Sequence, residues 1–172
     1  MNKTIKAALA GLVTSTAMLS AAYAEDIKVG ILLPYSGVYA ALGQDIDDAF
    51  ALGLETFGAD SGATFEIVRE DTEVKPPVGL AKTKKLILQD EVDVMVGVVS
   101  SGVLGAIRDT VDGAGVPLIV ANAGNDEATG EACSPFITRI SFSNSQINRP
   151  MGQWMFDRGV KKVFTIAPDY AA

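Results

Sequence analysis

Apolar runs and amphipathic stretches alternate along the chain from Ile27 onward. Three runs are nearly continuous, as in strands covered on both faces, and a fourth alternates. These predicted strands are 27–33, 64–69, 92–99 and 116–120. Apolar residues recur at helical spacing between them, which predicts helices over 42–57, 76–88 and 103–114. The alternation predicts an α/β fold, an open parallel sheet with helices on both faces.

The rhythm changes after Val120. Residues 121–134 are polar and glycine-rich, longer than an ordinary connection, and long loops in compact domains are usually functional. A strand is predicted over 136–142, and then a helix that places Ile147, Met151 and Trp154 on one face, with Pro150 in its first turn. A last strand is predicted at 163–167. The chain ends before another helix, which we interpret as the N-terminal part of a longer protein.

The first 24 residues have the pattern of a secretory signal peptide. Lys3 and Lys6 precede a short apolar run at 7–19, and Ala22-Tyr23-Ala24 has the small-x-small form of a cleavage site. No acidic residue occurs before Glu25. We therefore expect export to the periplasm; a retained N-terminal anchor is the alternative.

Composition excludes several classes of function. The chain contains no His, so a His-based catalytic triad or a His-ligated metal cannot form within it. Its formal net charge of −7 argues against nucleic acid, which needs a basic face. We expect no cofactor and no bound metal. The single Cys133 is either a free thiol or a buried, unreactive one.

Ligands of open parallel sheets bind at the carboxyl ends of the strands. The predicted strands end in four candidate segments: Tyr35-Ser36, Ser100-Ser101-Gly102, Asn122-Ala123-Gly124 and Tyr170. The serine pair is the most informative, because hydroxyl and backbone N–H donors at a helix N-terminus can bind a carboxylate. The alternative is that Ser101 only caps the helix.

Two acidic groups have simpler explanations than a metal site. Asp45, Asp47 and Asp48 fall in the first turns of a predicted helix, where a solvated face is expected. Glu70-Asp71 stands at a strand end and is expected to tie a loop. No phosphate-binding loop occurs, and Ser36-Gly37 lacks the flanks of a catalytic serine elbow.

Four segments together resemble the leucine/isoleucine/valine-binding protein family, the type I periplasmic solute-binding proteins of ABC transporters. They are IKVGILLPYSGVYAALGQDIDDAFALGLE, EDTEVKPPVGLAKTKKLI, VMVGVVSSG and VPLIVANAG. The resemblance implies two α/β lobes that close around a small ligand. Residues 25–134 would be the first lobe, and 135–172 a crossing strand and the start of a second lobe that is largely missing.

By that resemblance the ligand carboxylate is held at Ser101, with Ser100 adjacent, and at Asn122 and Gly124. Tyr170 maps to a tyrosine that follows the second lobe's first strand. The chain departs from amino-acid binders at Leu42, where an aromatic residue is common, and at Asn122 and Gly124, where a small residue and Thr are common. The segment CSPFITRISFSNSQ resembles the branch associated with aromatic acids.

The leading hypothesis is therefore a non-catalytic, extracytoplasmic binding protein. It would capture a small carboxylate-bearing solute, an amino acid or an aromatic acid, and deliver it to a membrane permease. The full-length protein is expected to be monomeric. The alternatives are a ligand-sensing receptor module of the same fold and, third, an exported hydrolase.

Overall fold

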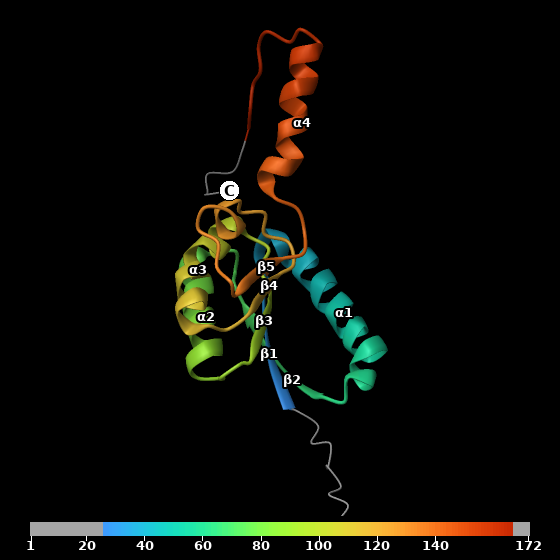
Figure 1. Cartoon of the computed structure of the whole chain (residues 1–172), viewed down its shortest axis with the longest axis vertical. Helices are drawn as coiled ribbons and strands as arrows, with labels where there is room; N and C mark the ends of the chain where they lie inside the picture. The colour runs from blue at the N-terminus through green and yellow to red at the C-terminus, as the bar shows by residue number, and fades with distance from the viewer. Residues whose placement is uncertain (1–25, 167–172) are drawn as a thin grey trace, which may run out of the picture.

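A five-stranded parallel sheet forms the centre of the molecule in the computed structural model, which describes residues 26–166 (Figure 1). Its strands are β1 (Asp26–Leu33), β2 (Thr64–Asp71), β3 (Val94–Gly97), β4 (Leu118–Val120) and β5 (Ile137–Arg139). They lie in the order β2-β1-β3-β4-β5, and every neighbouring pair is parallel. The predicted α/β fold with an open parallel sheet is confirmed. The predicted signal peptide and Tyr170 lie outside the described residues.

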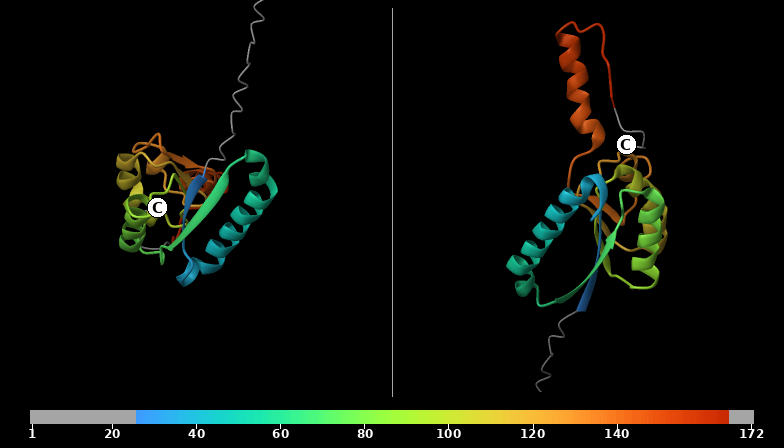
Figure 2. Two further views of the ribbon diagram at one scale, coloured as in Figure 1. Left: turned by 90° about the horizontal axis from the view of Figure 1, so that it is seen from below. Right: turned by 180° about the vertical axis from the view of Figure 1, so that it is seen from behind.

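Helices cover both faces of this sheet (Figure 2). Helix α1 (Ala40–Phe57) lies on one face, whereas α2 (Pro76–Leu88) and α3 (Ser101–Ala114) lie together on the other. Helix α4 (Asn144–Asp157) follows β5 and projects away from the sheet. Short 3-10 turns occupy Gly37–Tyr39, Gly58–Ser61 and Glu127–Thr129. Within 26–166, no helix is long and apolar enough to span a membrane.

Strand β1 divides the interior into two cores, because successive side chains of a strand point to opposite faces. Ile31 and Leu33 pack on the α1 side, and Leu32 packs on the α2–α3 side against Leu86 and Met95. All five of these side chains are fully buried. Complete burial of such a side chain stabilises the fold by roughly 1.5–3 kcal/mol. The central strands therefore hold both helical layers in place.

The start of α1 is fixed by a close approach of backbone to backbone. A Cβ atom on Gly43 would collide with the carbonyl oxygen of Pro34, at the end of β1. Only glycine therefore lets the first turn of α1 lie this close to the β1 loop. By contrast, Gly53 of the same helix has open space where a side chain would stand.

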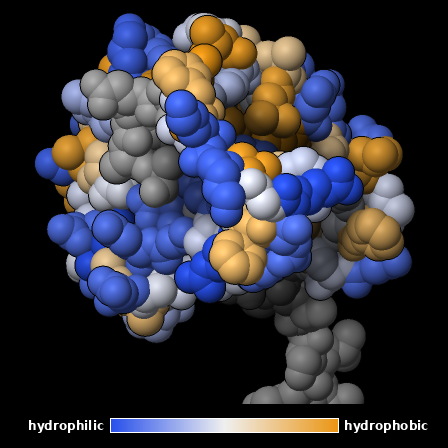
Figure 3. Space-filling model, turned by 90° about the horizontal axis from the view of Figure 1, so that it is seen from above, coloured by the Kyte–Doolittle hydropathy of each residue, from blue (hydrophilic) through white to orange (hydrophobic). Residues whose placement is uncertain are grey.

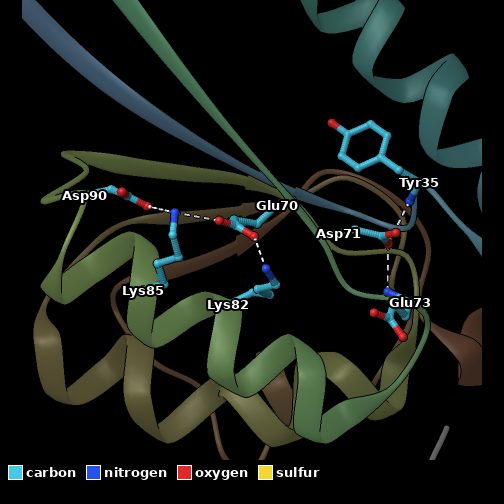
Figure 4. A network of polar contacts seen from close by, with 7 residues as sticks. All are labelled: Tyr35, Glu70, Asp71, Glu73, Lys82, Lys85 and Asp90. Atoms are coloured by element: carbon cyan, nitrogen blue, oxygen red, sulfur yellow. Dashed lines mark hydrogen bonds and ion pairs between the residues drawn. The ribbon is translucent and has the colours of Figure 1, made fainter.

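Ion pairs made by two buried carboxylates fix β2 to both helical layers. The Asp47 carboxylate on α1 is 6% exposed and accepts a 2.8 Å hydrogen bond from Arg69 of β2. It does not lie on the solvated face that the sequence predicted. On the other side, Glu70 lies 2.6 Å from both Lys82 and Lys85 of α2 (Figure 4). Burial alone would raise the pKa of Glu70, but hydrogen bonds from these two lysines outweigh it and lower the pKa.

The C-terminal part differs from the sequence prediction in two ways. Residues 160–166 form no strand, and Val163, Phe164 and Ile166 are exposed, since no described strand lies beside them to pair with. Helix α4 begins at Asn144, because Ser143 and Gln146 form a capping box there. Pro150 consequently lies in the second turn rather than the first.

The apolar face predicted for this last helix is present but uncovered. Ile147, Met151 and Trp154 are 57%, 55% and 50% exposed. Arg158 stacks over the Trp154 ring, 4.7 Å from its centroid. Apolar side chains are visible among polar ones at this end of the molecule (Figure 3).

We predict that Gly43→Ala destabilises the protein by about 1–3 kcal/mol, because the new methyl group cannot fit against Pro34. Gly53→Ala is the matched control in the same helix, and it should stabilise by about 0.5–1 kcal/mol. Chemical denaturation of the two variants measures both changes. Equal effects at the two positions would contradict the close approach.

We predict that Glu70→Gln lowers the free energy of unfolding at neutral pH and has little effect in acid. A group with a lowered pKa stabilises the fold fully above about pH 5 and loses that contribution as the pH falls through the folded value. Denaturant titrations from about pH 7 to 3 measure the difference from the unmodified protein. The control is Glu66→Gln, an exposed carboxylate 3.7 Å from Lys28. A Glu70→Gln effect that does not change with pH would refute the ion-pair explanation.

Candidate functional site

A cavity of about 170 Å³ lies where the chain leaves the carboxyl ends of four strands. Its walls come from the segments that follow β1, β3, β4 and β5. The residues that line it are Tyr39, Leu42, Val99, Ser101, Asn122, Gly124, Phe142 and Asn144. Strands β1 and β3 are neighbours whose following helices cover opposite faces, which is the position where open α/β sheets bind ligands.

The turn between β3 and α3 separates the roles of its two serines. Ser100 is the N-cap of α3, and its hydroxyl accepts a hydrogen bond from the Val103 N–H. Ser101 is the first residue of the helix and lines the cavity. The capping role that the sequence left open for Ser101 therefore belongs to Ser100.

The end of β3 also holds the end of β4 in place. The Val98 carbonyl accepts hydrogen bonds from the N–H groups of Asn122, at 3.3 Å, and Ala123, at 2.9 Å. Val98 itself has a φ of +62°, which is unfavourable for a β-branched residue. Such strain costs on the order of 1–3 kcal/mol and persists only where surrounding contacts fix it. Here these contacts set the Asn122 turn against the serine turn.

Asn144 joins the β5–α4 connection to both of these turns. Its N–H donates to the Gly124 carbonyl at 2.8 Å, and its side-chain amide donates to the Ser101 hydroxyl at 3.3 Å. A Cβ on Gly124 would collide with the Asn144 side chain and would lie 2.8 Å from the Phe142 ring. Glycine at 124 therefore permits the close packing of the β4 turn and the start of α4.

The lining of the cavity combines polar and apolar residues. Ser101, Asn122 and Asn144 contribute neutral hydrogen-bonding groups, whereas the remaining walls include the aromatic rings of Tyr39 and Phe142. None of the described residues that line it is charged. Across residues 26–166, no group of three or more His, Cys, Asp or Glu side chains is placed to hold a metal.

Tyr35 and Ser36, which the sequence predicted to bind the ligand, do not line the cavity. Asp71 draws their loop toward the end of β2, because its carboxylate accepts hydrogen bonds from the N–H groups of Tyr35 and Glu73 at 3.0 and 2.8 Å (Figure 4). Burial would raise the pKa of Asp71, but these donors and Ser36 lower it. The predicted loop-tying role of Glu70-Asp71 is thus confirmed for Asp71.

Tyr35 serves the core instead. Its ring packs with the apolar residues under α1, and its hydroxyl is buried. Burial, followed by the nearby Asp47 carboxylate, raises the pKa of this hydroxyl above its ordinary value. A phenol held neutral beneath a helix is not available to a ligand in the cavity.

The remaining residues that the sequence predicted as ligand-binding occupy different positions in the structure. Ser101, Asn122 and Gly124 meet at the cavity, and their role in ligand binding stays a prediction. Ser100 caps α3, Ala123 is fully buried in the core, and Gly102 does not line the cavity.

Sequence reasoning missed five of the lining residues: Tyr39, Leu42, Val99, Phe142 and Asn144. A signal for Asn144 was available in the Ser143-x-x-Gln146 pattern, which marks a helix start immediately after β5. Leu42 stood out only as a departure from the amino-acid binders. Tyr39 and Phe142 carry no local pattern that distinguishes a cavity wall from core.

Known proteins resemble this chain in both sequence and fold. Leu/Ile/Val-binding protein homolog 6 of Brucella abortus (strain 2308) is 30% identical over 171 residues, which cover 96% of this chain and 42% of that protein. A solute-binding protein of an ABC transporter from R. palustris, solved with benzoate, is 41% identical with a TM-score of 0.79, over 85% of this chain and 41% of its own. Another, from Rhodopseudomonas palustris BisB5 and solved with 3,4-dihydroxybenzoic acid, is 33% identical with a TM-score of 0.76, over 85% of this chain and 40% of its own.

The chain thus spans less than half the length of these relatives. Residues 26–172 match the family model described as periplasmic binding protein. The chain therefore belongs to the periplasmic binding protein family, which confirms the resemblance seen in its sequence.

Proposed function

We propose that the protein is the extracytoplasmic solute-binding component of an ABC importer and that its solute is a small aromatic carboxylate. The observation that carries this proposal is the uncharged cavity, which places hydrogen-bonding groups beside aromatic walls. Its volume of about 170 Å³ suits a small solute, because pockets for drug-sized ligands occupy roughly 300–1,000 Å³.

Neutral donors in the lining of the cavity can bind an anion. The Ser101 hydroxyl lies at the N-terminus of α3, where free N–H groups and the helix dipole favour negative charge. Hydrogen bonds to a carboxylate are stronger than those between neutral groups. A carboxylate can therefore be held without a basic residue, and the net charge of −7 does not oppose it.

The aromatic preference rests on the walls and on the relatives. Tyr39 and Phe142 offer ring faces and edges on which a planar ring can pack. None of the described residues lining the cavity carries a carboxylate that could pair with the ammonium group of an amino acid. The two R. palustris proteins were solved with benzoate and 3,4-dihydroxybenzoic acid. Together these features favour an aromatic acid over an amino acid.

The proposal includes the organisation inferred from the sequence. Residues 1–24 would direct export to the periplasm, 25–134 would form the first lobe, and 135–172 the crossing strand and the start of a second lobe. A membrane permease would receive the solute. Tyr170 would reach the ligand from the second lobe.

We predict that the whole protein, including any sequence that follows Ala172, binds benzoate or a hydroxybenzoate more tightly than leucine. Ser101→Ala should weaken aromatic-acid binding by about 10- to 100-fold, since it removes a hydrogen bond to a charged group. Isothermal titration calorimetry measures both effects.

Ser61→Ala is the control, because that hydroxyl bonds only within its own turn, far along the chain from the cavity residues. It should bind as the unmodified protein does. Failure of every aromatic acid to bind would refute the proposed solute, and an unchanged affinity in Ser101→Ala would refute the proposed site.

A further inference from the structure

We propose that Asn144 is a positioning residue that makes the Ser101 hydroxyl a hydrogen-bond donor toward the cavity and so selects a carboxylate over the corresponding amide. The inference rests on the proposed function and adds to it a residue and a basis for selectivity. It starts from the hydrogen bond that the Asn144 side-chain amide donates to the Ser101 hydroxyl oxygen.

The direction of this hydrogen bond determines whether the Ser101 hydroxyl can donate to a ligand. A side-chain NH₂ group can only donate, so the Ser101 oxygen must accept and its own hydrogen is left for another partner. The neighbouring Ser100 hydroxyl is engaged in capping Val103, and the Ser101 carbonyl is engaged with Asn125. Within residues 26–166 the Ser101 hydroxyl makes no other hydrogen bond, and it borders the cavity.

The backbone of Asn144 is held in place by two hydrogen bonds. Its backbone N–H donates to the Gly124 carbonyl at 2.8 Å, and its backbone carbonyl accepts a 2.8 Å bond from the Asn148 side chain. The capping box of Ser143 and Gln146 fixes the turn that carries it. The absence of a side chain at Gly124 leaves the space that Asn144 occupies.

A ligand group that only accepts hydrogen bonds is complementary to a serine that donates. A carboxylate presents two acceptor oxygens, whereas an amide of the same shape replaces one of them with an NH₂ group that needs an acceptor. A site that offers donors to both positions leaves that NH₂ group unsatisfied, which is costly in a buried place. Asn144 thereby contributes to selectivity through Ser101.

Replacing Asn144 with aspartate reverses the hydrogen bond. A carboxylate at this position accepts from the Ser101 hydroxyl, so the serine hydrogen is no longer available to the ligand. The new charge also repels an anionic ligand and can accept from the NH₂ group of an amide. The ratio of benzoate to benzamide affinity therefore measures the role of Asn144. A variant that merely lost structure would weaken the binding of both ligands, whereas the proposed role lowers the ratio.

The experiment is calorimetric titration of the whole protein with benzoate and with benzamide. Asn144→Asp should lower the ratio of benzoate to benzamide affinity by about tenfold or more, and Asn144→Ala by a few-fold, since it removes the orienting donor without adding charge. Gln153→Glu is the matched control: it makes the same amide-to-carboxylate change on an exposed residue further along α4, whose side chain bonds to Asp157, and its ratio should stay within about twofold.

The outcomes separate this inference from the function on which it rests. If the unmodified protein binds no aromatic carboxylate, the proposed function fails and the inference fails with it. If benzoate binds but the ratio is unchanged in Asn144→Asp, or falls equally in Gln153→Glu, the function stands and the role of Asn144 is refuted. If Asn144→Asp does not fold, an unchanged ratio in Asn144→Ala refutes it equally.

Discussion

Parallel pairing of the strands is the constraint on which the rest of the structure depends. A parallel strand can follow another only if the chain returns across a face of the sheet, so every carboxyl end meets at one edge. Here β1, β3, β4 and β5 release their loops at that edge, and the cavity forms among them. Residues of four separate segments are thus gathered at one place, although no single segment contains the whole site.

Close backbone approaches convert this edge into a defined cavity. Gly43 lets α1 begin against the end of β1, and Gly124 lets the start of α4 pack on the turn after β4. Between them, the strained backbone of Val98 holds the Asn122 turn by its carbonyl. The backbone strain at Val98 costs free energy locally. It is tolerated because the fully buried core on both sides of β1 fixes the strands.

The sequence was informative where local periodicity determines the structure. The spacing of apolar residues predicted the strands and helices through β4. The rule that ligands bind at the carboxyl ends of parallel strands drew attention to Ser101, Asn122 and Gly124. It failed where a tertiary contact overrides a local rule. Asp47 is buried because Arg69 pairs with it, and Tyr35 is drawn into the core while Asp71 ties down its loop. Cavity walls such as Phe142 look like core residues, so only the fold distinguishes them.

Asn144 shows why the chain beyond β5 matters to a site built largely by the sheet. It stands at the first position of α4, past the last strand, yet its hydrogen bonds end on the turns after β3 and β4. Any displacement of α4 relative to the sheet therefore changes the surroundings of Ser101 directly. Helix α4 also carries an exposed apolar face, so a partner that packed on that face would be linked to the cavity through Asn144 and the other contacts at the start of the helix.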